Sequence, residues 1–267
     1  MKQLATDIDD TIDASADTVD KNRKRSSGGA AAGREYRRVL QIRKILRAAY
    51  PVVKTQLRHK NPFQLLVATI LSAQCTDRQV NAVTPALFNR LKTPQDFVDV
   101  PVAELERLIH STGFFHNKAK NLKKCARALI DQFDGVVPDT LDDLVKLPGV
   151  GRKTANVVLG AAFDKPGMVV DTHVARISGR LGLTAHTDPV KIEFELMERI
   201  PRKDWNDFSL WLIYLGRSLC MARKPDCPAC FLRRLCSYPE KTGKPIDEPA
   251  RNPSGTSPPS ARTVQER

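Results

Sequence analysis

The stretch "LPGVGRKTANVVLG" (residues 147–160) decides the fold, because it predicts a tight turn between two helices. Pro148 disfavours helical geometry at Leu147 and so ends the first helix. Gly149 and Gly151 allow a positive φ or a close approach of the backbone to another group. The second helix begins at about Arg152, and apolar residues recur along one of its sides at positions 155, 158, 159 and 162.

Two nucleotide-binding motifs are excluded by spacing. A Walker A loop needs a first glycine where Lys146 stands, and Arg152 separates the second glycine from Lys153. A dinucleotide-binding fingerprint needs a third glycine at Thr154 and a strand before the loop. The preceding segment instead predicts a short helix with Thr140 as its N-cap.

The turn predicts a contact with one backbone phosphate of DNA. Amides at the start of a helix point outward without partners, and they lie at the positive end of the helix dipole. The expected donors are the backbones of Gly149, Val150, Gly151 and Arg152. An ordinary turn between two helices is the alternative, since glycine-containing turns join many helices.

The charge of the chain favours a polyanionic partner. The net charge is +13 over 267 residues and the isoelectric point is about 9.6. Residues 1–20 carry one Lys and six Asp, so the remainder is more basic still. No run of about 18 apolar residues could span a membrane, and no apolar segment near the N-terminus suggests a signal peptide. These features predict a cytoplasmic protein, associated with the nucleoid if DNA is its partner.

Residues 34–238 read as one helix after another, which predicts an all-α fold. Residues 1–33 are rich in Asp, Ser, Gly and Ala, and residues 239–267 hold six Pro and almost nothing large and apolar, so both segments are predicted to be disordered tails. The basic run at 21–25 is interpreted as solvated, with a loose electrostatic arm as the alternative. The predicted helices span residues 37–50, 62–71, 77–91, 102–110, 117–133, 172–181, 189–200 and 204–219.

Four of the six cysteines fall close together with the spacing C-x6-C-x2-C-x5-C. They are Cys220, Cys227, Cys230 and Cys236. Disulfides are disfavoured in a large cytosolic chain, and a structural zinc site usually has two C-x-x-C-like pairs where this sequence has one. Four thiolates with uneven loops suit a [4Fe–4S] cluster, with zinc as the alternative. Cys125 lies on an apolar helix face and is predicted to be in the core; Cys75 has no assigned role.

Combined, these motifs resemble the endonuclease III family of DNA base-excision glycosylases. The resemblance covers about residues 35–238 and includes "LPGVGRKTANVVL" (147–159), "VDTHVARI" (170–177), "ILSAQCTD" (70–77), "TGFFHNKAKN" (112–121) and the four cysteines with "MARKPD" (221–226) between the first two. It implies two helical lobes with DNA in the cleft between them. A six-helix bundle with the hairpin would span residues 55–164, and residues 34–54 with 165–238 would form the iron–sulfur lobe.

Lys153 and Asp171 are the expected catalytic residues. The helix start and the neighbouring Arg152 disfavour an ammonium at Lys153, and a neutral amine is a nucleophile. Asp171 precedes a helix, so it is interpreted either as an N-cap or as a carboxylate facing the cleft. The resemblance implies that Lys153 attacks C1′ of a damaged pyrimidine nucleotide and that Asp171 assists, giving base removal followed by AP lyase cleavage.

The resemblance also implies residues that contact DNA or the flipped base. Gln74 and Phe114 would be the two intercalating residues, one filling the gap in the base stack and the other wedging the opposite strand, with a polar helix end and a core aromatic as the alternatives. Arg223 and Lys224 lie between two cysteine ligands and are expected to meet phosphate. Asp77 and His173 are candidates for the base pocket, and a structural role at the helix start is the alternative for His173.

Two other functions compete with a bifunctional enzyme. An adenine-specific mismatch glycosylase would lack Lys at 153 and usually carries a further C-terminal domain. A non-catalytic iron–sulfur DNA-binding or redox-sensing protein would not need Lys153 and Asp171 together. The sequence therefore predicts a monomeric glycosylase and lyase that acts on double-stranded DNA and needs no nucleotide cofactor.

Overall fold

The computed structural model describes residues 27–238, with side chains described from residue 32 onward. This part of the chain contains α-helices and short 3-10 helices and no strand. The prediction of an all-α fold is therefore confirmed.

One group of helices, the first lobe, packs around a core of buried residues that runs from Leu57 to Leu159. At its centre every residue of α3 from Leu65 to Leu71 is buried, because this apolar helix is covered by α4, α7 and α9. The helices of this lobe are α3 (Pro62–Leu71), α4 (Asp77–Arg90), α5 (Pro94–Asp99), α6 (Val102–Ile109), η1 (His110–Thr112), α7 (Phe115–Phe133), α8 (Leu141–Leu144) and α9 (Arg152–Phe163).

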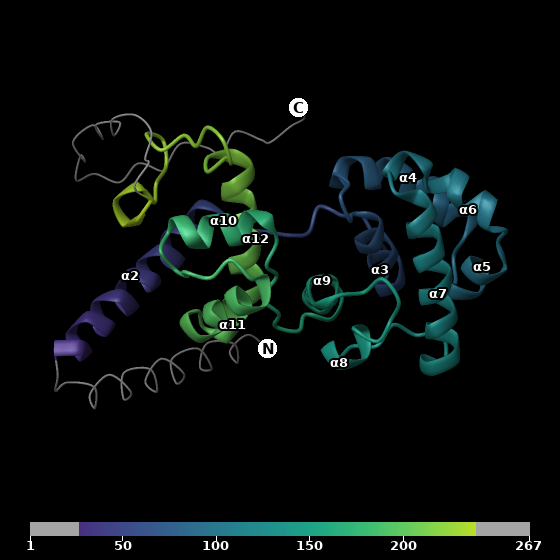
Figure 1. Ribbon diagram of the computed structural model, residues 1–267, viewed down its shortest axis with the longest axis horizontal. Helices are drawn as coiled ribbons and strands as arrows, with labels where there is room; N and C mark the ends of the chain where they lie inside the picture. The colour runs from purple at the N-terminus through teal and green to yellow at the C-terminus, as the bar shows by residue number, and fades with distance from the viewer. Residues whose placement is uncertain (1–26, 239–267) are drawn as a thin grey trace, which may run out of the picture.

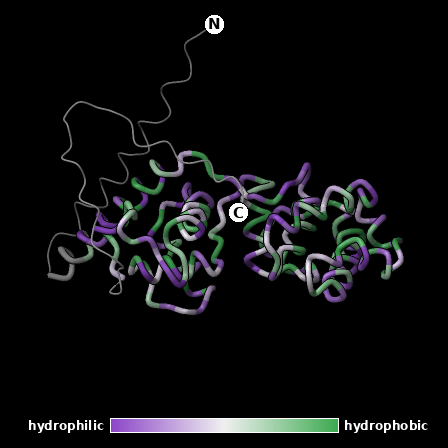
Figure 2. Tube along the Cα trace, turned by 90° about the horizontal axis from the view of Figure 1, so that it is seen from above, coloured by the Kyte–Doolittle hydropathy of each residue, from purple (hydrophilic) through white to green (hydrophobic). Residues whose placement is uncertain are grey.

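The other group, the second lobe, has its own core with Phe208 and Trp211 fully buried. The Trp211 indole donates a hydrogen bond of 3.0 Å to the carbonyl of Tyr50. This bond joins the helix Trp205–Ser218 to the end of the helix Ser27–Ala49, which Tyr50 directly follows. Figures 1 and 2 show the two groups side by side from two directions. The second lobe contains α2 (Ser27–Ala49), α10 (Thr172–Arg180), α11 (Pro189–Arg199), η2 (Arg202–Asp204), α12 (Trp205–Ser218) and η3 (Arg233–Leu235).

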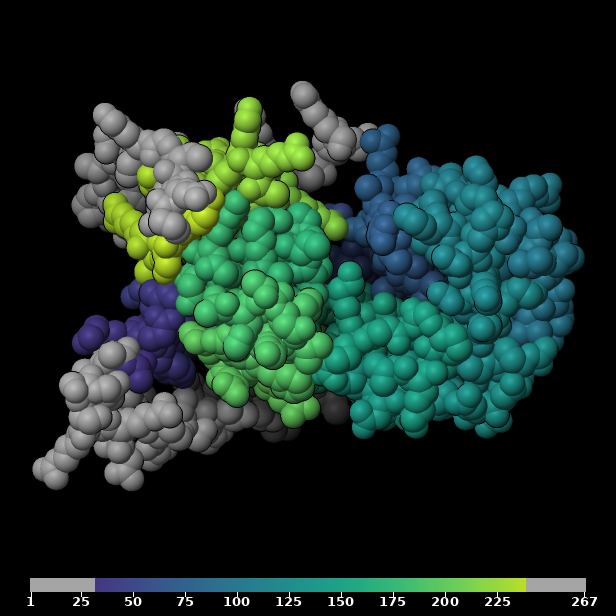
Figure 3. Space-filling view, in the orientation of Figure 1, coloured from purple at the N-terminus to yellow at the C-terminus, as the bar shows by residue number. Residues whose placement is uncertain are grey.

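The chain passes between the lobes twice, after α2 and after α9. The sequence predicts one lobe of residues 55–164 and another of residues 34–54 and 165–238. Such a division requires two separate cores, and the structure has two. The exact boundaries stay predictions. The surface is hollowed between the lobes on the upper side of Figure 3.

The N-terminal boundary needs a correction. The predicted disordered tail extended to residue 33, but α2 already begins at Ser27. An alanine run at 30–32 explains the earlier start, since alanine has the highest helix propensity. The rest of that tail, the basic run at 21–25, and the predicted tail at 239–267 lie outside the described residues.

Most helix ends agree with the sequence because side-chain caps define them. Asn61, Thr76, Thr140 and Asp188 each accept a hydrogen bond from a backbone amide in the first turn of the helix that follows. The short helix α5 was missed, although Thr93 and Asp96 form a capping box at its start. Six residues are too few for a recognisable apolar period.

Gly216 of α12 is predicted to be required for close packing of α10 on α12. A Cβ atom there would lie 2.5 Å from Nδ1 of His173 and 2.9 Å from Cδ1 of Ile177. Gly216→Ala is expected to lower the free energy of unfolding by about 1–3 kcal/mol through overpacking, measured by denaturant titration. Gly179→Ala, where nothing lies within 4 Å, is the control. Equal stability of the two variants would contradict the prediction.

Candidate active site and DNA-binding surface

In the hairpin between α8 and α9, the predicted backbone is found at Gly149, whereas Gly151 has neither a positive φ nor a close neighbour in the protein. Gly149 has a φ of +82°, and a Cβ there would lie 3.0 Å from the side chain of Asn121 on α7. Gly151 is the N-cap of α9; it is extended, and nothing lies within 4 Å of the place a Cβ would occupy. No side chain caps α9. The amides at its start therefore have no capping side chain and can donate to an anion.

Lys153 lies in the first turn of α9 and its side chain is exposed. Its neighbour Arg152 points to the second lobe, where Nη2 lies 2.6 Å from Oε1 of Glu193 and Nε lies 3.2 Å from Oε2. This ion pair gives the Arg152 side chain a partner other than DNA. The predicted DNA contact of the Arg152 backbone stays a prediction.

Asp171 is the N-cap of α10, and its Oδ1 accepts a hydrogen bond of 2.8 Å from the amide of Val174. The N-cap interpretation is therefore confirmed, and the half-buried carboxylate has a fixed position. Lys153 lies in the first turn of α9, a helix of the first lobe, and Asp171 is the N-cap of α10, a helix of the second lobe. The two candidate catalytic groups thus come from opposite sides of the connection after α9.

Gln74 and Phe114 share an unusual backbone conformation. Their φ angles are +52° and +50°, values that residues other than glycine rarely adopt. Both side chains are exposed, Phe114 by 63%. The alternative of a core aromatic at 114 is therefore wrong. Strained backbone persists where its surroundings hold it, often at functional sites, so the geometry suits two side chains that project into a ligand.

Lys118 holds the loop that carries Phe114, and the sequence analysis missed it. Its residue surface is only 4% exposed, and Nζ donates a hydrogen bond of 2.8 Å to the carbonyl of Thr112. Burial lowers the pKa of Lys118 below that of an ordinary lysine. A second bond of 2.7 Å joins Gln79 of α4 to Ser111. No local pattern predicts a buried lysine, because the burial arises from tertiary packing.

Asp77 and His173, the two base-pocket candidates, both have protein partners. Asp77 accepts a hydrogen bond of 2.8 Å from Arg217 of α12, so this pair joins the two lobes. His173 is half-buried against Gly216, and its Nδ1 lies 3.2 Å from Nη2 of Arg176. Burial lowers the pKa of His173; Asp171 opposes this effect. These contacts support a structural role for His173 between α10 and α12, while its place in a base pocket stays a prediction.

The four cysteines of the C-x6-C-x2-C-x5-C segment line one cavity together with Arg180 and Tyr238. Among residues 27–238 no three His, Cys, Asp or Glu side chains are grouped to hold a single metal ion. Cys125 is buried as predicted, and burial raises the pKa of its thiol to about 12.

Arg180 fixes the loop between the first two of these cysteines. Its guanidinium donates to the carbonyls of Met221 and Ala222, each at 2.8 Å, and lies 3.3 Å from Sγ of Cys220. The next residues, Arg223 and Lys224, are exposed. The anchored loop thus presents two cations to solvent, as the sequence predicts for a phosphate contact.

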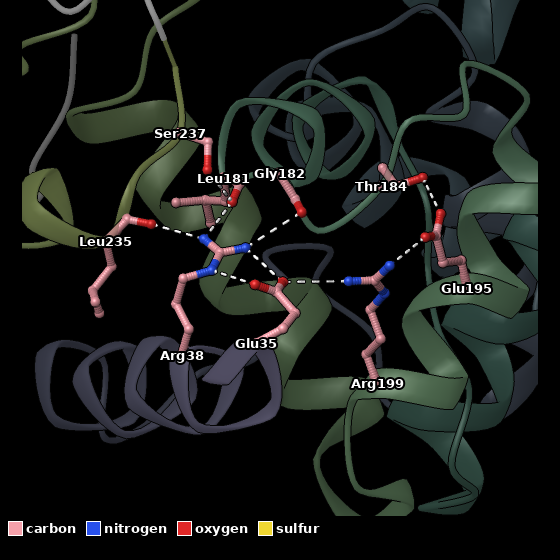
Figure 4. A network of polar contacts seen from close by, with 9 residues as sticks. All are labelled: Glu35, Arg38, Leu181, Gly182, Thr184, Glu195, Arg199, Leu235 and Ser237. Carbon is pink, nitrogen blue, oxygen red and sulfur yellow. Dashed lines mark hydrogen bonds and ion pairs between the residues drawn. The ribbon is translucent and has the colours of Figure 1, made fainter. Parts of the chain in front are cut away.

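Arg38 of α2 fixes the other end of the cysteine segment (Figure 4). It donates to the carbonyls of Leu181 and Leu235 at 2.7 and 2.8 Å and forms an ion pair of 2.7 Å with Glu35. The network continues through Arg199 to Glu195 of α11. All of these contacts lie within the second lobe. The contacts of Arg38 with Leu181 and Leu235, and that of Glu35 with Arg199, join residues more than 140 positions apart, so the sequence alone could not predict them.

Comparison with known proteins supports this geometry. Residues 67–202 match the HhH-GPD superfamily of base excision DNA repair proteins. Endonuclease III of Synechocystis is 54% identical over 74% of this chain and 91% of its own length, and endonuclease III of Bacillus subtilis is 47% identical over 73% and 90%. The chain belongs to the endonuclease III family.

Two solved structures extend the comparison to the fold of DNA complexes. A non-covalent endonuclease III–DNA complex has a TM-score of 0.71, with 47% identity over 74% of this chain and 95% of that one. A trapped endonuclease III–DNA covalent intermediate has a TM-score of 0.72, with 46% identity and the same coverage. The predicted family and the predicted class of base-excision DNA glycosylase with lyase activity are thus confirmed.

No described helix is long and apolar enough to cross a membrane.

Proposed function

We propose that this chain removes oxidised pyrimidines from double-stranded DNA and cleaves the strand at the abasic site through a Schiff base on Lys153. The main support is the placement of Lys153, exposed in the first turn of α9 directly after the hairpin, with Asp171 at the start of a helix of the opposite lobe. The type of lesion and the roles of Lys153 and Asp171 are carried over to this chain from the family that it belongs to.

DNA would bind across the hollow between the lobes. The uncapped amides at the start of α9 hold one backbone phosphate, and Arg223 with Lys224 meets another. The damaged nucleotide turns out of the stack, which costs least where pairing is already weakened. Gln74 then fills the gap, and the exposed Phe114 ring wedges the opposite strand.

The chemistry follows from one amine and one carboxylate. Asp171 accepts a proton from Lys153, whose amine then attacks C1′ of the deoxyribose. The glycosidic bond breaks, and the base leaves with the bonding electrons and takes the proton that Asp171 had accepted. The sugar ring opens as O4′ takes a proton from the nitrogen of Lys153, which gives a protonated imine between C1′ and Lys153. The regenerated Asp171 carboxylate then accepts a proton from C2′, and the electrons of that C–H bond expel the 3′ phosphate by β-elimination, which cuts the strand.

Cys220, Cys227, Cys230 and Cys236 would hold a [4Fe–4S] cluster, which when bound keeps the loop with Arg223 and Lys224 rigid. The four thiols line one cavity, which supports a shared metal centre, and their uneven spacing in the sequence favours a cluster over a single zinc ion. Purified protein is expected to be brown and to contain iron and sulfide; a colourless protein loaded with zinc would overturn this assignment. We also propose that the protein acts as a monomer and that it works in the cytoplasm, at the nucleoid.

Borohydride trapping of the native protein tests the proposal. Duplexes with one thymine glycol, one abasic site or no lesion are incubated with the full chain and borohydride. A covalent protein–DNA band is expected with the first two duplexes and not with the third. A band with the abasic duplex alone would overturn the oxidised-pyrimidine assignment, and no band at all would overturn the lyase.

The two competing functions give different results in the same experiment. A monofunctional glycosylase would release a base without a trapped band, and a non-catalytic DNA-binding protein would do neither. The joint presence of Lys153 and Asp171 in the described geometry favours the bifunctional enzyme.

A further inference from the structure

Glu193 of α11 carries an almost fully buried carboxylate that faces the first lobe. The residue is 5% exposed, yet it belongs to a helix whose neighbouring residue Ile192 packs in the core of the second lobe. Two side chains of α9 reach it. Arg152 forms a two-point contact at 2.6 and 3.2 Å, and Nδ2 of Asn156 donates to Oε1 at 3.2 Å.

Asn156 extends this contact to the segment that connects the lobes. Its Nδ2 also donates a bond of 3.0 Å to the carbonyl of Met168. A Cβ at Gly167 would lie 2.9 Å from Oδ1 of Asn156, so the segment passes directly over this amide. The amides of Gly167 and Val169 are in turn bonded to side chains of α12, at 2.8 and 2.9 Å.

These contacts connect Glu193 to the elements that carry the two candidate catalytic groups. Lys153 directly follows Arg152, so whatever holds Arg152 holds the first turn of α9. On the other side, α11 and α10 share one core, in which Ile192 lies with Val174, three residues after Asp171. The buried carboxylate therefore connects the helix start that carries Lys153 to the lobe that carries Asp171.

We propose that Glu193 is a positioning residue that sets the distance between Lys153 and Asp171 by clasping α9 to the second lobe. The clasp consists of Glu193, Arg152 and Asn156, and its role in catalysis rests on the function proposed above. A carboxylate is suited to this task because it accepts bonds from all the donors at once, and arginine binds it with two parallel N–H groups. Misplacement of reacting groups by about 1 Å costs up to about a hundredfold in rate.

Glu193→Gln tests the clasp because it keeps the size of the side chain and removes its charge. The rate of adduct formation under single-turnover conditions is expected to fall about tenfold to a hundredfold, while the affinity for an abasic duplex stays within about twofold. Arg152→Lys, which keeps the positive charge but lacks the two-point geometry, is expected to give a fall in the same direction.

Glu195→Gln is the matched control. Glu195 lies on the same helix but pairs with Arg199 at 2.7 Å and Thr184 inside the second lobe. Its replacement is expected to leave the rate of adduct formation unchanged. A rate in Glu193→Gln that falls only in proportion to the fraction of folded protein, or equally in both variants, would overturn the positioning role.

Amide hydrogen exchange supplies a measurement that does not depend on catalysis. Exchange in the peptide 164–171 is expected to be faster in Glu193→Gln than in the native protein, and unchanged in Glu195→Gln. Equal exchange in Glu193→Gln and the native protein would overturn the clasp. If the native protein forms no adduct, the proposed function fails, but this comparison still decides whether Glu193 couples the lobes.

Discussion

Lys153→Ala is expected to abolish the trapped protein–DNA adduct and to slow strand cleavage at an abasic site by about a thousandfold or more. Removal of a nucleophile eliminates the covalent path, and comparable losses in other enzymes reach several powers of ten. The side chain is exposed, so the variant should fold as the native protein does. Gel analysis of borohydride reactions gives the adduct, and single-turnover cleavage gives the rate.

Binding separates this result from a loss of DNA contact. The hairpin amides are backbone groups, so Lys153→Ala keeps them, and its affinity for an abasic duplex should stay within about tenfold of the native value at equal salt. Lys165→Ala is a control for the loss of a lysine: Lys165 pairs with Asp139 at 2.6 Å at the far end of α9. An adduct in Lys153→Ala equal to that in Lys165→Ala would assign the Schiff base to another amine.

Helix boundaries were the part of the fold that the sequence could predict, since local chemistry determines them. Thr140, Asp171 and Asp188 cap the helices they precede, and Pro62 and Pro189 occupy first turns, where proline is tolerated. The start of α2 and the short α5 were the exceptions, because neither had a strong apolar period.

The site was predictable where its chemistry lies in one segment and not where it depends on distant partners. The hairpin, Lys153 and the four cysteines are each contained in fewer than 20 residues. Glu193 lies 41 positions from Arg152, and Arg180 lies 40 positions from Cys220. Such pairs exist only after the helices have packed, so no period or spacing in the sequence identifies them.

Asp204 is expected to make the largest single polar contribution to stability in the described part of the chain. Its carboxylate is 1% exposed and forms ion pairs with Arg43 and Arg47 of α2. Asp204 is also the last residue of η2 and the N-cap of α12. Its backbone amide donates a hydrogen bond of 2.9 Å to the carbonyl of Pro201. The buried charge thus fastens α2, which is distant in sequence, to the rest of the second lobe.

Asp204→Asn is expected to lower the free energy of unfolding by about 3–5 kcal/mol, because it leaves the half-buried Arg43 without a charged partner. At about 2–4 °C per kcal/mol, the Tm should fall by roughly 10 °C. Glu35→Gln is the matched control: Glu35 also pairs with two arginines, Arg38 and Arg199, but is 39% exposed. Solvent screens that pair, so its loss should cost about 1 kcal/mol or less. Equal Tm values for the two variants would show that burial of Asp204 adds nothing to its ion pairs.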